Sequence, residues 1–289
     1  MAHDQLIADY LAPMSPLPTS ITPGGGLVEK IQCVLFDIYG TLFISGSGDI
    51  SVAEKASPLS QKLEHLVHKY DVGKTPQALV GELHDAIEIK HRQLRDNGID
   101  YPEIEIDEIW QQILGIDDIQ LARKFAIEYE LIVNPVYPMP HLKSLLAACR
   151  QQNLAMGIIS NAQFFTPLLF EWFLDTRMEK LGFDSELIFL SYQMGYAKPS
   201  MVPFEKALTA IKARGFDAAS SLYVGNDMLN DIYPANRLGF QTALFAGDAR
   251  SLRLRNDDSR CFSLLADLVL TDLAQLIDYL QQIKGIEQV

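Results

Sequence analysis

The sequence predicts an α/β fold, a doubly wound parallel sheet with an inserted all-helical domain. From about residue 141 onward, short apolar runs typical of buried strands alternate with segments of helical periodicity. Such alternation indicates a parallel sheet that is covered by helices on both faces. Before it, residues 45–135 show only helical spacing of their apolar side chains, so this stretch is the predicted insert.

The first predicted strand runs from Ile31 to Phe36 and ends abruptly at Asp37, and Gly40 permits a tight turn directly afterwards. Burying a carboxylate without a partner is costly, so Asp37 needs a structural or a chemical reason to be there. It could cap its own turn. It could also face a ligand, because ligands bind at the carboxyl ends of the strands in open α/β sheets.

Residues 1–30 are predicted to be an N-terminal arm and linker, because several prolines precede a run of three glycines at 24–26. Tyr10, Leu11 and Met14 could pack onto the body of the protein or onto a second subunit, which leaves a homodimer open.

In the predicted insert, apolar residues recur three or four positions apart, as on one face of a helix, at Leu63, Leu66 and Val67 and again at Leu79, Leu83 and Ile87. Pro135 marks the return of the chain from the insert. The α/β core then comprises residues 31–44 and 136–289. Its further predicted strands are 154–159, 187–190, 221–224, 241–245 and 267–270.

Composition restricts the class of partner. A net charge of −13 argues against nucleic acid and anionic membranes, since both bind cationic surfaces. A small anionic substrate is still compatible, because a few local cations and backbone N–H groups suffice to bind it. The first residues lack a signal-peptide profile, and the three cysteines are far apart in the sequence. We therefore expect a cytoplasmic protein with reduced thiols.

Polar residues follow the predicted strands at four places, which are Asp37-Ile38-Tyr39-Gly40-Thr41-Leu42, Ser160-Asn161, Lys198-Pro199, and Gly225-Asn226-Asp227 with Asp231. In this order they resemble the four motifs of the haloacid dehalogenase (HAD) superfamily, a group of hydrolases with an aspartate nucleophile and a Rossmannoid core. The resemblance covers residues 31–42 and about 141–245, and the insert is similar in position to a type-1 cap.

The resemblance implies a role for each motif residue. Asp37 would be the nucleophile, Tyr39 would occupy the acid–base position, and Lys198 would supply a fixed positive charge. Thr41, Ser160, Asn161 and Lys198 would bind the transferring group of the substrate. The implied cofactor is Mg²⁺, bound by oxygen ligands on Asp37, Tyr39 (through its carbonyl), Asn226, Asp227 and Asp231.

Two positions depart from the phosphatase pattern. Tyr39 replaces the Asp that protonates the leaving alcohol in the phosphatases of this superfamily, and a tyrosine is a poor proton donor at pH 7. Asn226 replaces the first acid of the fourth motif and contributes no charge, although Asp227 and Asp231 keep the site acidic and favour a metal.

Three functions therefore stay open. The first is a Mg²⁺-dependent phosphatase of a small phosphorylated metabolite. The second is a metal-free 2-haloacid dehalogenase. The segment Asp37-x-Tyr39-Gly40-Thr41 resembles motif I of those enzymes. In that case Arg92, Arg95 or Arg123 of the insert could bind the substrate carboxylate. The third is a catalytically weak binding protein on the same fold.

A basic stretch, Arg250-Ser251-Leu252-Arg253-Leu254-Arg255, follows the strand predicted at 241–245. We expect it to be a solvated loop or a contact for an acidic partner surface.

Overall fold

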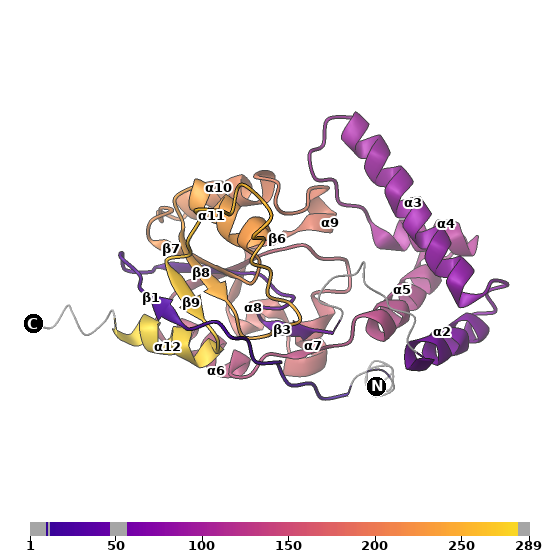
Figure 1. Cartoon of the computed structure of the whole chain (residues 1–289), viewed down its shortest axis with the longest axis horizontal. Coiled ribbons are helices and arrows are strands. Elements are labelled where there is room, and N and C mark those ends of the chain that lie inside the picture. The colour runs from indigo at the N-terminus through magenta and orange to yellow at the C-terminus, as the bar shows by residue number, and fades with distance from the viewer. Residues whose placement is uncertain (1–9, 11, 47–56, 283–289) are drawn as a thin grey trace, which may run out of the picture.

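The computed structural model describes residue 10 and residues 12–46 and 57–282. A seven-stranded sheet forms its centre, with the strand order β1-β9-β8-β7-β2-β5-β6 (Figure 1). The strands are β1 (Gly24–Gly25), β2 (Cys33–Phe36), β5 (Ala155–Ser160), β6 (Phe183–Leu190), β7 (Ser221–Gly225), β8 (Gln241–Phe245) and β9 (Leu268–Leu270). All neighbours pair in parallel except β1 with β9. The predicted fold class is confirmed.

Strand β2 is an interior strand of the sheet, as its apolar run, buried along its whole length, requires. It pairs with β5 on one side and with β7 on the other, in registers that place Phe36 beside Ile158 and Val224. The residues that follow these three strands therefore meet at one edge of the sheet.

Helices cover both faces of the sheet. On one face pack α6 (Leu142–Gln151), α7 (Leu168–Leu174) and α12 (Leu273–Gln282). On the other pack α10 (Val202–Ala213) and α11 (Tyr233–Arg237). Short helices α8 (Met178–Leu181) and α9 (Ser191–Met194) flank β6, and a π-helix, η1 (Met228–Ile232), leads into α11.

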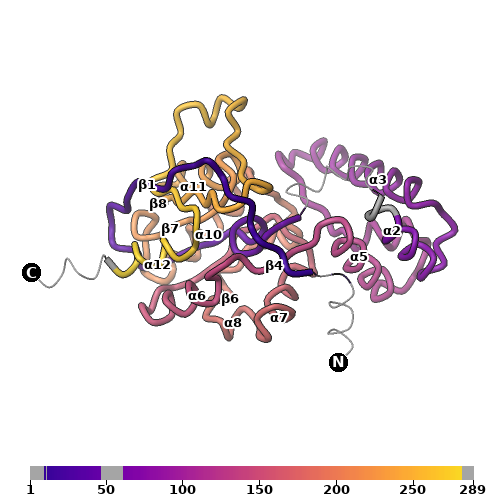
Figure 2. The backbone as a smooth tube through the Cα atoms, turned by 60° about the horizontal axis from the view of Figure 1, so that its bottom comes forward, coloured from indigo at the N-terminus to yellow at the C-terminus, as the bar shows by residue number. Residues whose placement is uncertain are grey.

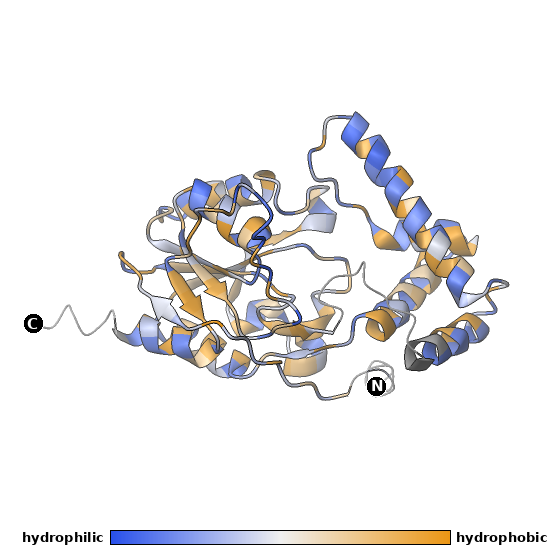
Figure 3. Cartoon of the chain, in the orientation of Figure 1, coloured by the Kyte–Doolittle hydropathy of each residue, from blue (hydrophilic) through white to orange (hydrophobic). Residues whose placement is uncertain are grey.

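The helical insert consists of α2 (Ser57–Lys69), α3 (Pro76–Asp96), α4 (Ile106–Leu114) and α5 (Ile119–Val133). It has a separate apolar cluster that includes Leu66, Leu79, Trp110 and Phe125. Figure 3 shows orange sheet strands and a largely blue outer surface of α3, as burial of only one helix face requires. The chain enters the insert after β3 (Phe43–Ser45) and leaves it before β4 (Val136–Pro138), and these two strands pair antiparallel.

The N-terminal arm runs along the core and reaches the insert (Figure 2). Where the sequence predicted a flexible linker, Gly24 and Gly25 form β1 at the edge of the sheet, because the backbone of β9 supplies a pairing partner. Met14 packs against the core, and the Tyr10 hydroxyl donates to Glu128 of α5 over 2.6 Å. Leu11 lies outside the described residues.

Among the described residues, no helix is both long and apolar enough to cross a membrane. The three cysteines are free and buried.

Candidate active site

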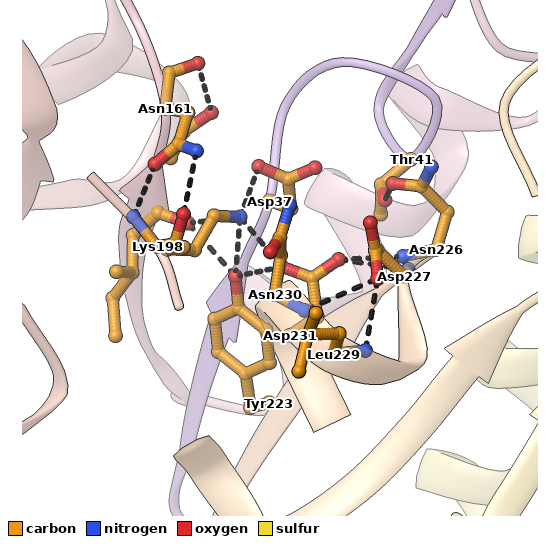
Figure 4. A network of polar contacts seen from close by, with 12 residues as sticks. Asp37, Thr41, Asn161, Lys198, Tyr223, Asn226, Asp227, Leu229, Asn230 and Asp231 are labelled. Atoms are coloured by element: carbon orange, nitrogen blue, oxygen red, sulfur yellow. Dashed lines mark hydrogen bonds and ion pairs between the residues drawn. The ribbon is translucent and has the colours of Figure 1, made fainter. Parts of the chain in front are cut away.

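Asp37 and Lys198 meet in a buried ion pair at the edge of the sheet where β2, β5 and β7 end (Figure 4). The ammonium nitrogen Nζ of Lys198 lies 2.8 Å from Oδ1 of Asp37, and the two residues are 6% and 7% exposed. Of the two carboxylate oxygens of Asp37, only Oδ1 has a hydrogen-bond partner among the described residues. The other oxygen, Oδ2, is therefore available to an electrophile or a cation.

Lys198 is held between two carboxylates. Besides Asp37, its Nζ donates to Oδ1 of Asp231 over 2.5 Å and to the carbonyl of Ile159 over 3.3 Å. Burial lowers the pKa of Lys198, but the charges of Asp231 and Asp37 outweigh burial and raise the pKa above its ordinary value. Lys198 is therefore a permanent cation beside the candidate nucleophile.

Asp231 positions other groups of the site. Its Oδ1 contacts Lys198 and accepts from the Tyr223 hydroxyl over 3.0 Å, while its Oδ2 accepts the backbone N–H groups of Asn226 and Asp227. Burial raises the pKa of Asp231 to about 7, although the Lys198 ammonium opposes the shift. All of its oxygens thus have protein partners, and it stands in η1, a π-helix of the kind that is frequent at functional sites.

Asp227 is neutralised by an arginine. Arg255 donates to both of its carboxylate oxygens, with Nη2 lying 2.6 Å from Oδ2, and the N–H groups of Leu229 and Asn230 bind Oδ1. The acidic cluster that the sequence predicted around Asp227 and Asp231 is therefore largely offset by Arg255 and Lys198.

The basic stretch at 250–255 is not a solvated loop, contrary to our expectation. Its backbone pairs with the fourth motif, since Arg253 N–H donates to the Asn226 carbonyl over 3.0 Å and Met228 N–H donates to the Arg253 carbonyl over 2.9 Å. Ser251, Arg253 and Arg255 line the site cavity. The loop docks there because the backbone at Asn226 and Met228 offers hydrogen bonds that no local pattern in the sequence reveals.

Tyr39 points toward Thr166, with 3.0 Å between the two hydroxyl oxygens. Burial raises the pKa of Tyr39 far above its ordinary value, and the carboxylate of Glu130 raises it further. Tyr39 consequently stays protonated at neutral pH and is a poor general acid or base. Glu130 on α5 lines the same cavity. Burial raises the pKa of Glu130 to about 7, although the hydrogen bond from the Asn134 amide lowers it.

This shift predicts a pH-dependent stability. A carboxyl group whose pKa rises from 4.5 to about 7 on folding stabilises the protein at low pH, and this contribution is lost as the pH rises through 7. We expect Glu130→Gln to raise the unfolding free energy at pH 8 by about 1–2 kcal/mol and to leave it nearly unchanged at pH 4. Urea unfolding at both pH values tests this, with the exposed Glu108→Gln as control. An equal effect at both pH values would contradict the assignment.

Most of the residues predicted to bind the transferring group do not face the cavity with a free side-chain group. Thr41 is fully buried and donates to Oδ1 of Asn226 over 3.1 Å, and the Ser160 hydroxyl donates to the Asn161 carbonyl; neither residue lines the cavity. Asn161 does line it, but its amide bonds the backbone N–H and carbonyl of Lys198. These side chains hold the loops of the site, whereas Lys198 faces the cavity.

The cavity has a volume of about 420 Å³ and lies between the core and the insert. Asp37, Lys198, Asn226 and Arg255 are at its core side, and α3, α4 and α5 contribute its opposite wall. Arg92, Arg95 and Arg123, the insert arginines considered for a substrate carboxylate, do not line it. Arg123 is instead paired with Asp107 over 2.7 Å.

Sequence reasoning missed Tyr223, Arg255 and Glu130. A tyrosine in the otherwise apolar strand at 221–224 could have drawn notice, since a buried hydroxyl needs a partner. Arg255 belongs to a basic run that we interpreted as surface. Nothing in the helical periodicity around Glu130 indicates that it faces the site.

The sequence profile of the family described as haloacid dehalogenase-like hydrolase matches residues 84–245, more than half of the chain. The chain belongs to this family. The matched range includes Lys198, Asn226 and Asp231, whereas Asp37 lies before it.

Among similar proteins, the HAD-like chain is 25% identical over 260 residues to the glyceraldehyde 3-phosphate phosphatase of Methanocaldococcus jannaschii, with 88% of this chain and 99% of that protein aligned. Solved structures of the same fold include an L-2-haloacid dehalogenase, with a TM-score of 0.53, 17% identity and coverage of 88% and 100% of the two chains. They also include a HAD phosphatase from Thermococcus onnurineus, with a TM-score of 0.51, 17% identity and coverage of 88% and 98%.

The oxygen atoms of this HAD-like site are potential ligands for Mg²⁺. This ion prefers oxygen ligands and is usually bound by one or two carboxylates together with substrate and water. The described residues contain no group of three or more His, Cys, Asp or Glu side chains arranged to hold a metal. Oδ1 of Asp37, which accepts one bond from Lys198, and Oδ1 of Asn226, which accepts one bond from Thr41, each keep a second lone pair. This smaller oxygen set fits a Mg²⁺ that completes its shell with substrate and water.

Proposed function

We propose that this HAD-like hydrolase cleaves the phosphate monoester of a small metabolite, with Asp37 as nucleophile. The observation that carries the proposal is the buried Asp37–Lys198 pair at the end of the central strand, with one carboxylate oxygen open to a cavity of about 420 Å³. The phosphatase name of the Methanocaldococcus jannaschii relative, aligned over 88% of this chain, supports the same chemistry.

In this mechanism Oδ2 of Asp37 attacks phosphorus in line, and a phosphoryl-aspartate forms as the bond to the leaving alcohol oxygen breaks. That oxygen takes a proton from the solvent. Water then hydrolyses the acyl phosphate, which releases phosphate, restores the Asp37 carboxylate and returns the proton to the solvent. Lys198 stays protonated beside Asp37 and offsets the negative charge that gathers at phosphorus. Asp231 and Tyr223 hold the ammonium in place, so no reorientation is needed during the reaction.

We further propose that Mg²⁺ binds to Oδ1 of Asp37, Asn226 and the carbonyl of Tyr39, which leaves Oδ2 of Asp37 for the attack on phosphorus. Asp227 and Asp231, two of the ligands implied by the resemblance, are occupied by Arg255 and Lys198 and are left out of this set. The ion would supply positive charge against the phosphate oxygens.

The rival function is metal-free dehalogenation of a 2-haloacid. It is favoured by Tyr39, which is a poor general acid or base, and by the neutralisation of Asp227 and Asp231. A leaving halide needs no proton, and a site with fewer free carboxylates tolerates an anionic substrate without a metal.

Phosphate release from p-nitrophenyl phosphate, measured with Mg²⁺ and with EDTA, tests the proposal, because this leaving group needs little protonation. Mg²⁺-dependent release supports it. Halide release from 2-chloropropionate without phosphate release would replace it with the dehalogenase. The absence of both activities would favour the third function, a binding protein.

Tyr39→Asp is expected to raise the turnover of alkyl phosphates by about 10²-fold, because general acid catalysis contributes on this scale when the leaving group is a poor one. Turnover of p-nitrophenyl phosphate should change far less. Tyr39→Asn, of the same size but without an acid, is the control and should show no gain. Equal gains from the two substitutions would mean that side-chain volume limits turnover rather than protonation.

A further inference from the structure

The wall that α3, α4 and α5 contribute to the cavity is largely apolar. Its apolar and aromatic side chains are Leu83 and Ile87 of α3, Ile106 and Trp110 of α4, and Ala126 and Tyr129 of α5. His91 of α3 and Glu130 of α5 are polar residues on this wall, whereas Asp37 and Lys198 lie on the core side. A phosphate bound at Asp37 and Lys198 would therefore direct its organic group toward this apolar wall.

The apolar wall is a fixed surface. The rings of Trp110 and Tyr129 lie 4.7 Å apart, and Trp110 also packs against Phe125 with 4.8 Å between the ring centroids. Leu83 and Ile87 stand one turn apart on α3, so they present one continuous stripe. Because these side chains also belong to the apolar cluster of the insert, or pack against it, they are held in place without a substrate.

Several polar groups along the same wall already have protein partners. The Glu103 carboxylate accepts from Ser191 and Gln163, and the amide of Asn134 donates to Glu130 while its oxygen accepts from Ser45. A substrate rich in hydroxyl groups would lose its bonds to water here and find few replacements. Each buried polar group without a partner costs about 1–3 kcal/mol.

Among the described residues, one fully buried polar atom of this wall has no hydrogen-bond partner. Nε2 of His91 is buried, lacks a hydrogen bond within the described chain, and belongs to a residue one further turn along α3 from Ile87. Burial also lowers the pKa of His91, so its ring is neutral at pH 7. Nε2 can then donate or accept one hydrogen bond, according to the tautomer, with a single polar group of a ligand.

We propose that the substrate is the phosphate monoester of a mainly apolar alcohol, aliphatic or aromatic, with at most one polar group within reach of His91. This rests on the proposed phosphatase function and names the substrate class of that site. A cavity of about 420 Å³ falls within the range of roughly 300–1,000 Å³ for small-molecule sites, so it admits an organic group well beyond the phosphate.

The test is a series of n-alkyl phosphates from ethyl to hexyl, compared with glycerol 3-phosphate. We expect kcat/KM to rise about fourfold for each methylene until the cavity is filled, because a buried CH₂ contributes about 0.8 kcal/mol. Glycerol 3-phosphate should react more slowly than propyl phosphate, which has the same number of carbons. A faster reaction of glycerol 3-phosphate would overturn the inference and leave the phosphatase function standing.

Two isoleucines of α3 give a matched pair of variants. Ile87→Ser removes apolar surface from the wall, so the hexyl-to-ethyl ratio of kcat/KM should fall about tenfold. Ile89→Ser changes a residue of the same helix that is 54% exposed and lies outside the cavity, and it should leave the ratio unchanged. Equal effects of the two substitutions would contradict the assignment. Ile87→Phe, which shortens the cavity and stays apolar, should also lower the ratio if Ile87→Ser fails to fold.

Binding of alkylphosphonates by the full chain, measured by calorimetry, separates this inference from the chemistry. Affinity that increases from ethylphosphonate to hexylphosphonate without any phosphate release would support the apolar wall and overturn only the proposed hydrolysis. Affinity that is independent of chain length would overturn the inference, whatever the catalytic activity.

Discussion

Replacing Asp37 with Asn should abolish phosphate release, with a loss of at least about 10³-fold in kcat, as expected when a nucleophile is removed. An amide of the same shape cannot attack phosphorus. In the buried pair, the oxygen of the introduced amide can still accept a hydrogen bond from Lys198, which lies 2.8 Å from Oδ1 of Asp37. The substitution therefore removes the chemistry and keeps the geometry.

The stability of this variant should stay within about 1 kcal/mol of the parent. Loss of the attraction to Lys198 is offset by relief of the repulsion between Asp37 and Asp231, which raises the pKa of Asp231. Phosphate release and urea unfolding are the two measurements, and Asp85→Asn, an exposed change on α3, is the control. Retention of more than about a tenth of the parent's activity would show that Asp37 is not the nucleophile.

Replacing Lys198 with Met should lower the unfolding free energy by about 3–5 kcal/mol at pH 8, because it leaves Asp37 and Asp231 buried without a countercharge. Activity should be lost as well. The destabilisation should be smaller at pH 5, since Asp231, whose pKa is raised to about 7, takes up a proton and loses its charge as the pH falls. Urea unfolding at pH 5 and pH 8 measures the loss of unfolding free energy and the direction in which it changes with pH.

A double variant distinguishes uncompensated charge from lost packing. If the Lys198→Met defect comes from the buried carboxylates, adding Asp231→Asn should restore part of the lost stability at pH 8. The exposed Lys206→Met on α10 should change stability little. Additive losses in the double variant would mean that the side-chain stem of Lys198, rather than its charge, stabilises the site.

The local sequence pattern predicts most of the strands of the sheet. The apolar runs at Ile31 to Phe36 and at 221–224 predict strands β2 and β7, because short apolar runs bounded by turn residues are typical of strands in a sheet covered on both faces. The parallel order of the sheet then follows from the alternation with helices. Gly24 and Gly25 became a strand for a nonlocal reason, since the edge of β9 was unpaired without them.

The candidate site was only partly predictable for the same reason. Asp37 directly follows β2, where the sequence marks it, and Lys198 lies in the loop between α9 and α10, within the Lys198-Pro199 motif that the sequence also shows. The partners of Asp227 and Asp231 are different, because Arg255 is 28 positions away from Asp227 and Lys198 is 33 away from Asp231. An acidic pair that favoured a metal in the sequence is therefore largely neutralised in the folded chain.

Local pattern in the chain was enough to predict the α/β sheet, the helical insert and the position of Asp37 at the end of a buried strand. These follow from the spacing of apolar residues and from the polar residues that interrupt it. Three other features emerged only on folding, namely which charges neutralise one another, the turn of Tyr39 toward Thr166, and the apolar wall opposite Asp37. Those outcomes depend on contacts between residues far apart in the chain, where desolvation and charge pairing set the chemistry and periodicity carries no information.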